Sequence, residues 1–269
     1  IAAKRRHAGV ARLAGHLLDA DLVHADETTI QVLKELGKKA QTKSYLWAQV
    51  TGSGPPIRLF GYAAGRGATY ADTNGLTHLG CWAHCRRYFV EAEAVIPQAA
   101  RSPEQPATQF IAAIGGLYAV ESKAKDKSIA ERQRLRDELS RPVLQKIEAM
   151  LLTHLHTVVP GSLLGKALHY LSAQWRKLVR YVENGAWPID NNLFENAIRP
   201  FVIGRRNWLF ADTVAGAHAS ANLYSLVETC KANGVDPYAD LVRLFQKLPT
   251  TITADDFEAL LPWRFATSS

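Results

Sequence analysis

Cysteine is scarce in this sequence, which has only Cys81, Cys85 and Cys230 among its 269 residues. A small and odd number of cysteines argues against a disulfide framework and favours a reducing compartment, so we expect a cytoplasmic protein. Long hydrophobic runs are also lacking, and the most apolar stretch, residues 163–171, contains a lysine and a histidine. Because a membrane helix needs roughly 18 apolar residues in succession, we expect no membrane partner.

The charge balance is basic, with 32 lysines and arginines against 25 aspartates and glutamates. This excess permits a polyanionic partner but does not require one. Hydrophobic residues make up 47% of the chain, enough to fill one large core or two small ones, and the composition is not that of a disordered chain. The first residue is Ile1 rather than Met, which suggests the edge of a fragment.

The N-terminal part predicts a helix and then a small sheet. Residues 1–18 have apolar residues at helical spacing and a basic face, which favours a helical linker over a nucleic-acid contact. Residues 22–32, 44–50 and 57–62 read as strands joined by short turns, and short turns are typical of an antiparallel meander.

The remaining chain is mostly helical in pattern. After a glycine-rich stretch, we expect helices over 84–94, from about 97 to 184, and over 217–233, with Ser128 and Glu131 as a capping box and Ser140 as a second helix start. Asp236 followed by Pro237 predicts one further helix start. Residues 190–198 predict a short helix that Pro200 ends, and residues 201–210 predict an extended segment.

Two acidic residues stand out as candidates for catalysis. Asp26 is expected at the end of a strand, where a carboxylate can project into a site from a rigid support. Glu195 lies one turn after Asn191 and Asn192 and one turn before Arg199, as if held in one orientation. The alternatives are a solvated acid at a strand end and an exposed, capped helix with a Glu–Arg pair.

Two further groups of residues could bind a ligand. Arg205 and Arg206 precede Trp208, and arginines grip phosphates while an aromatic ring can stack on a base. The alternative is a surface segment that Trp208 anchors. Cys81, His84 and Cys85 could be metal ligands, but their spacing lacks the two separated pairs of a structural zinc site and favours packing.

Several long motifs in one order resemble a single family. The chain is similar to transposases of the insertion sequence 66 family, a resemblance that covers about residues 8–263. It is carried by residues 24–28 (His-Ala-Asp-Glu-Thr), 80–89 (Gly-Cys-Trp-Ala-His-Cys-Arg-Arg-Tyr-Phe), 190–200, 204–210 (Gly-Arg-Arg-Asn-Trp-Leu-Phe) and 260–263 (Leu-Leu-Pro-Trp).

The resemblance implies an α/β fold with a ribonuclease-H-like mixed sheet, a large α-helical insertion and a helical C-terminus. It also implies an Asp-Asp-Glu active site in which two Mg²⁺ ions support DNA strand cleavage and transfer. Asp26 and Glu195 match the first aspartate and the glutamate and would hold metal. By the same resemblance, DNA would be contacted by five residues: Asn192, Arg199, Arg205, Arg206 and Trp208. The DNA partners would be the transposon ends and the target. The chain would also self-associate in a transposition complex and lie at the nucleoid.

The second aspartate of the family has no clear match. The family carries it in an Asp-Gly-Tyr motif before residues 80–89, and this chain has no such motif. The interval from residue 62 to 80 is also shorter than the family's, and Asp72 is its only acid. We therefore interpret residues 67–75 as an internal deletion that removed one strand, one helix and a metal ligand, with Asp72 as a weak substitute.

The sequence thus predicts a truncated, catalytically impaired transposase, or alternatively a non-catalytic DNA-binding remnant that competes with intact transposase. The expected segments are a basic helical linker at 1–20, the first part of the core at 21–96, the helical insertion at 97–184, the glutamate-bearing part of the core at 185–248 and a C-terminal tail at 249–269.

Overall fold

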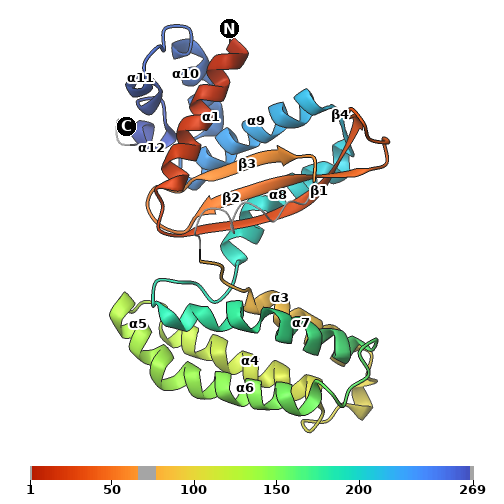
Figure 1. Ribbon diagram of the computed structural model, residues 1–269. Coiled ribbons are helices and arrows are strands. Elements are labelled where there is room, and N and C mark those ends of the chain that lie inside the picture. Colours follow the sequence, from red (N-terminus) through yellow and green to blue (C-terminus); the bar gives the residue numbers. More distant parts are fainter. Residues whose placement is uncertain (1, 66–76, 267–269) are drawn as a thin grey trace. The chain divides into compact units, whose positions relative to one another are not determined.

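The computed structural model describes residues 2–65 and 77–266. It divides into two compact units (Figure 1). One unit comprises residues 1–68 and 192–269 and is called the sheet unit here; the other comprises residues 69–191 and is called the helical unit. Each is described by itself.

The sheet unit contains a four-stranded mixed sheet in the order β3-β2-β1-β4. As predicted, β1 (Val23–Lys34), β2 (Lys43–Thr51) and β3 (Arg58–Ala63) form an antiparallel meander. The short strand β4 (Ala211–Thr213) then pairs in parallel with the far end of β1. The strand at β4 was not predicted.

One face of this sheet is largely apolar, because alternate residues of each strand point to the same side of the sheet. The register aligns Asp26, Ala48 and Phe60 in one cross-strand row, so these three side chains share a face. Ile30 and Leu46 belong to the same face and are buried. Part of α9 (Val214–Ala232) packs against this face, and so does a second long helix.

That helix is α8 (Asn192–Trp208), and it corrects two expectations. Pro200 does not end it, and residues 201–208 are helical rather than extended. A proline inside a helix removes one backbone hydrogen bond and clashes with the preceding turn. The apolar spacing nevertheless continues past it, because Phe194, Ala197 and Phe201 pack against the apolar face of the sheet. Burial of these side chains outweighs the local preference of the proline.

The end of α8 is strained. Leu209 has a φ of 63°, which among the described residues makes it the one non-glycine residue with a positive φ. Its backbone N–H donates to the carbonyl oxygen of Arg205 at 2.8 Å, which closes the helix. A left-handed backbone costs roughly 1–2 kcal/mol for a residue with a Cβ, and glycine is the usual residue here.

A second apolar cluster joins the first helix of the chain to its C-terminal helices. Leu13 and Leu17 of α1 (Ala2–Leu18) are buried against Leu226, Leu244 and Leu261. The expected linker at 1–20 is therefore packed against other parts of the sheet unit. The helices involved are α9 (Val214–Ala232), α10 (Pro237–Lys247), α11 (Ala254–Glu258) and α12 (Pro262–Ala266).

An acidic residue fixes this contact. Arg12 donates through Nε to Glu258 Oε2 at 2.9 Å, and Nε2 of His16 lies 2.7 Å from the same oxygen. Burial raises the pKa of Glu258, but these two hydrogen bonds and the neighbouring charges outweigh it and hold the pKa below its usual value. The carboxylate thus remains charged where α1 meets α11.

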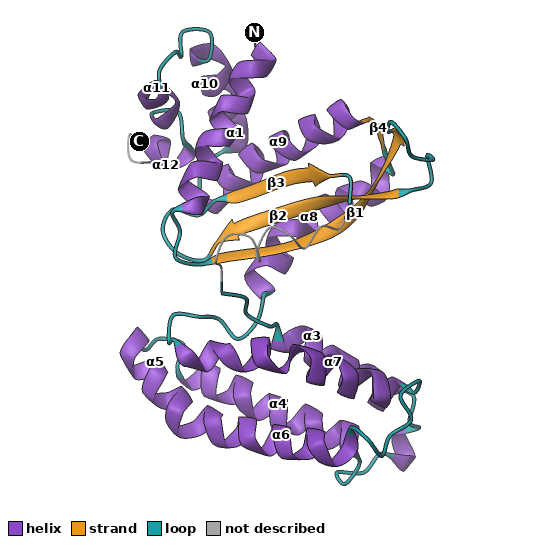
Figure 2. Ribbon diagram, viewed as in Figure 1, coloured by secondary structure: helices purple, strands orange, loops and turns teal. Residues whose placement is uncertain are grey.

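Every regular element described in the helical unit is a helix (Figure 2). Its elements are α3 (Trp82–Ala94), the 3-10 turn Gln98–Ala100, α4 (Pro106–Lys123), α5 (Ile129–Leu135), the π turn Arg136–Ser140, α6 (Arg141–His154), α7 (Leu163–Leu178) and the 3-10 turn Val179–Glu183. Ser128 and Glu131 form the predicted capping box. α6 begins at Arg141, directly after Ser140, as predicted. Ser140 itself has helical backbone and makes no side-chain cap bond, because a π turn joins α5 to α6.

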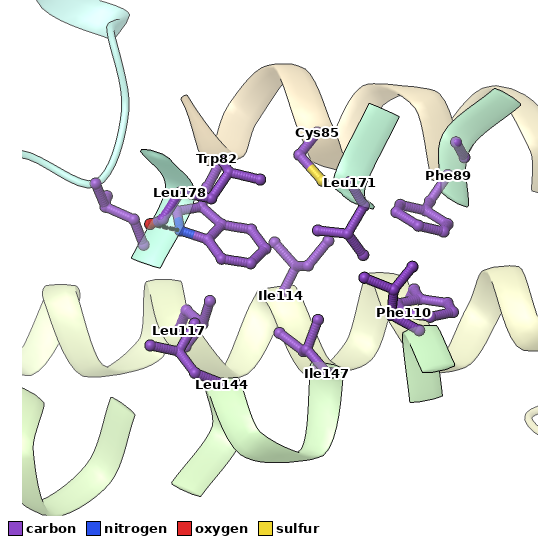
Figure 3. Close-up of a cluster of buried hydrophobic side chains, with 14 of the residues drawn as sticks. Trp82, Cys85, Phe89, Phe110, Ile114, Leu117, Leu144, Ile147, Leu171 and Leu178 are labelled. Carbon is purple, nitrogen blue, oxygen red and sulfur yellow. Dashed lines mark hydrogen bonds between the residues drawn. The ribbon is translucent and has the colours of Figure 1, made fainter. Parts of the chain in front are cut away.

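The core of this unit is built around aromatic rings (Figure 3). Phe89 stacks on Phe110 with ring centroids 4.5 Å apart, and the indole of Trp82 donates to the carbonyl oxygen of Leu178 at 2.8 Å. Trp82 and Phe89 lie on α3, within the segment 21–96 that the sequence assigns to the first part of the core. The structure groups α3 with the helical unit, where its apolar face packs against α4 and α7.

A buried arginine ties three parts of the helical unit together. The guanidinium of Arg136 is fully buried and pairs with both oxygens of Glu121, at 2.8 and 2.7 Å. It also donates to the carbonyl oxygens of Tyr181 and Asn184, at 2.7 and 2.9 Å. These bonds satisfy a charge that would otherwise be costly to bury.

We predict that Arg136→Met lowers the free energy of unfolding by about 3–5 kcal/mol, because it leaves Glu121 without its partner. Chemical denaturation of the purified chain measures this. The control is Arg141→Met, which breaks the exposed pair with Asp137 and should cost less than about 1 kcal/mol. Equal losses for the two variants would contradict the structural role of Arg136.

We predict that Leu209→Gly raises the free energy of unfolding by about 1 kcal/mol, since glycine adopts this φ without strain. Thermal unfolding reports the change. The same substitution at Leu223, a similarly exposed leucine inside α9, should lower the free energy of unfolding by about 1 kcal/mol. A loss of stability in Leu209→Gly would show that the leucine side chain contributes more than its backbone costs.

Candidate functional site

Asp26 lies inside β1 rather than at its end, which corrects the expected position. The strand continues past it because β2 pairs along the whole stretch, from Val23 opposite Thr51 to Gln31 opposite Lys43. One oxygen of Asp26 accepts the backbone N–H of Glu27 at 2.8 Å. Asp26 therefore projects from a fixed strand, on the face of the sheet against which α8 packs.

Glu195 lies in the first turn of α8, where the helix dipole favours a negative charge. It is half-buried beside the fully buried Phe194. Asp26 and Glu195 therefore lie on two elements that pack together in the sheet unit, Asp26 on β1 and Glu195 on α8. Asp72, the weak third candidate, lies outside the described residues.

A row of polar side chains runs along one side of α8. At 100° per residue, four residues fall within one narrow sector of the helix, mostly turned away from its buried stripe: Asn192, Glu195, Arg199 and Arg206. Asn192, Arg199 and Arg206 are exposed. We call these four residues the α8 polar row. Two arginines on a rigid helix, turned to solvent, can contact successive phosphates of a nucleic acid.

Arg205 has a different environment from its neighbour Arg206. Its Nη1 donates to the hydroxyl oxygens of Thr28 and Thr29, both at 3.0 Å, and to the backbone carbonyl oxygen of Thr29. Arg205 therefore joins the C-terminal part of α8 to β1. No pattern in the sequence distinguished Arg205 from Arg206, because the difference arises from which side of α8 faces the sheet.

Trp208 is part of the packing of the sheet unit. Its ring lies against Phe201 with centroids 5.3 Å apart, edge to face. A side chain at Gly204 would come within 3.1 Å of the Trp208 indole nitrogen and 2.5 Å of the Tyr224 hydroxyl, so the glycine permits this packing. These contacts favour the anchoring alternative for Trp208.

The cysteine motif belongs to the core of the helical unit. Cys85 is fully buried, and burial, followed by the nearby Cys81, raises the pKa of its thiol. Cys81 accepts the backbone N–H of Asn191 at 3.4 Å. Across residues 2–65 and 77–266, no group of three or more His, Cys, Asp or Glu side chains could hold a metal ion.

Comparison with known families decides the relationship of the chain. Residues 7–74 and 68–219 match the family model described as "Transposase IS66 family", and residues 225–263 match the model described as "IS66 C-terminal element". The chain belongs to the IS66 transposase family. The match confirms the resemblance seen in the motifs. It is broken into two segments that overlap at residues 68–74.

Three curated relatives come from Sinorhizobium fredii (strain NBRC 101917 / NGR234). "Uncharacterized protein y4qI" is 30% identical over 293 residues, covering 94% of this chain and 53% of its own length. "Uncharacterized protein y4jD" is 28% identical over 290 residues, with 94% and 55% covered, and "Uncharacterized protein y4hP" is 25% identical over 297 residues, with 96% and 53% covered. The chain spans about half the length of these relatives.

Each of the three alignments is longer than the 269 residues of the chain, so the relatives carry residues that have no counterpart in it. No solved structure matches the chain. Within the described part of the chain, none of the helices has the length and apolar character to cross a membrane.

We predict that Arg205→Met lowers the free energy of unfolding by about 1.5–3 kcal/mol, because it removes charged hydrogen bonds between α8 and β1. Arg206→Met, the adjacent exposed position, should change it by less than about 0.5 kcal/mol. Denaturant titration of the two variants side by side measures the difference. Equal stability of both variants would show that the bonds to the threonines contribute nothing.

Proposed function

We propose that this chain is the core of an IS66 family DNA transposase that still binds DNA but is impaired in strand cleavage and transfer. The observation that carries the proposal is the family match, which extends over nearly the whole chain yet breaks at residues 68–74. The intact family members would cleave and join DNA strands with the help of divalent metal ions.

The strand order supports a ribonuclease-H-like core. Three antiparallel strands are followed, after a long intervening segment, by a strand parallel to β1, and α8 covers one face. On this proposal the helical unit is the large insertion between the strands and the glutamate-bearing helix. Asp26 then lies on the first strand of the core, which is where the family resemblance puts the first aspartate.

The impairment follows from the carboxylates. Mg²⁺ prefers hard oxygen ligands, and a two-ion site needs a compact cluster of carboxylates. Asp26 and Glu195 would supply two, and the family's third ligand belongs to an interval that is shortened here. The break in the family match supports an internal deletion at this place, and the extra residues in all three relatives agree with a loss somewhere in the chain.

DNA binding does not need the missing ligand. Arg199 and Arg206 are exposed on a helix that the core holds rigidly, and the chain has a net charge of +7. Phosphate contacts of this kind act on any DNA sequence and weaken as salt rises. We expect the chain to lie at the nucleoid and to compete with intact transposase for DNA.

The test is binding of the purified chain to duplex DNA, followed by a strand-transfer assay with Mg²⁺. Binding should be detected at low salt and weaken as salt rises. A plot of the logarithm of the binding constant against the logarithm of the salt concentration should have a slope of about −0.9 for each phosphate contacted. Strand transfer should be undetectable. In a mixture with an intact family transposase, added chain should lower that enzyme's strand transfer.

Two outcomes would overturn the proposal. No duplex binding at low salt would remove the DNA-binding function. Strand transfer by the chain that Glu195→Gln abolishes would show that the active site is intact, with Asp72 or another residue as the third ligand. Asp137→Asn, an exposed acid of the helical unit, is the matched control and should leave every readout unchanged.

A further inference from the structure

Two consecutive residues, Leu209 and Phe210, have large apolar side chains that are exposed to solvent. Leu209 is 62% exposed and Phe210 is 43% exposed, and together they form the whole connection between α8 and β4. Single exposed apolar residues are common on proteins and need no explanation. Here two occur in succession, and the first has the strained, left-handed backbone described above.

The Leu209–Phe210 pair is held at both ends. On one side Trp208 packs against Phe201, and on the other Ala211 pairs with Val32 of β1. Within the connection the N–H of Leu209 donates to the Arg205 carbonyl oxygen at 2.8 Å, and the N–H of Phe210 donates to the Trp208 carbonyl oxygen at 2.7 Å. Both side chains therefore project from a backbone that the core fixes.

Strain of this kind persists only where the surrounding structure imposes it, and it concentrates at binding sites. A glycine at residue 209 would remove the strain, and polar residues would remove the exposed apolar surface. The pair thus combines two unfavourable features at one solvent-facing point. A bound partner that receives the two side chains would account for both.

The charges beside the pair favour an anionic partner. Arg206 is exposed and lies one turn before Phe210. The nearest acid along the chain, Asp212, is already paired with Lys34 at 2.9 Å. A stable protein interface buries about 1,200–2,000 Å² of surface in total, which is far more than two side chains offer. DNA-bending proteins, in contrast, insert only one or two apolar side chains between base pairs. The pair therefore fits DNA better than a protein partner.

We propose that the Leu209–Phe210 pair is an apolar wedge that enters the base stack of duplex DNA while Arg206 contacts the adjacent phosphate. This rests on the proposed DNA-binding function and adds a specific contact to it. The wedge gains apolar contact with the bases, at the expense of unstacking one base step. Pyrimidine–purine steps such as TA unstack most easily, so the wedge should favour them over stiff A-tracts.

The experiment uses the full chain and two short duplexes, one with a central TA step and one with an A-tract. Each carries a fluorescent adenine analogue whose emission rises when it unstacks. The chain should bind the TA duplex more tightly and raise its emission. The double variant Leu209→Gly with Phe210→Ser should bind about tenfold more weakly and leave the emission unchanged, with the salt dependence of binding unaltered.

Two control variants separate the wedge from general effects. Arg206→Ala should keep the emission rise but reduce the salt slope by about one, as expected for a lost phosphate contact. Leu223→Ser, an exposed leucine of α9, should change neither readout. Thermal unfolding of the double variant at the temperature of the binding assay separates a loss of binding from a loss of fold.

The failure of this inference is distinguishable from the failure of the proposed function. Equal affinity and equal emission rise in the double variant would overturn the wedge while DNA binding stands. No binding by the unaltered chain at low salt would overturn both. A self-associating chain that the double variant renders monomeric, with DNA binding unchanged, would identify the pair as a contact between copies and overturn the wedge.

Discussion

The packing of α8 against one face of the sheet is the interaction on which the rest of the sheet unit depends. Phe194 and Phe201 fill the space above Leu46 and Phe60, and this contact decides which side of α8 is buried. Each fully buried aliphatic or aromatic side chain contributes about 1.5–3 kcal/mol, so four such residues outweigh one lost backbone hydrogen bond. Every role assigned to residues of α8 follows from this orientation.

The same contact explains why neighbouring residues of one basic motif differ so much. Arg205 lies over β1 and is bonded to two threonines, whereas Arg206 is turned to solvent. Trp208 packs on Phe201, and the chain must then leave α8 through the strained Leu209 to reach β4. One helix orientation thus separates an arginine bonded to the sheet, an arginine turned to solvent and an exposed apolar pair.

The proposed loss of catalysis is compatible with a stable fold. Asp26 is held by the full pairing of β1 with β2, and Glu195 by the packing of α8 on the sheet. A two-ion site needs every ligand of its carboxylate cluster, whereas these packing contacts are made by other residues. DNA contacts on α8 would therefore outlast strand transfer.

The sequence by itself determined the local elements and the family. The meander from β1 to β3, the capping box at Ser128 and the start of α10 follow from turn, alternation and capping patterns that act over a few residues. It could not give the length of α8, the packing of α1 against the C-terminal helices or the different environments of Arg205 and Arg206. Those depend on burial between segments far apart in the chain, and only the tertiary structure brings these segments together.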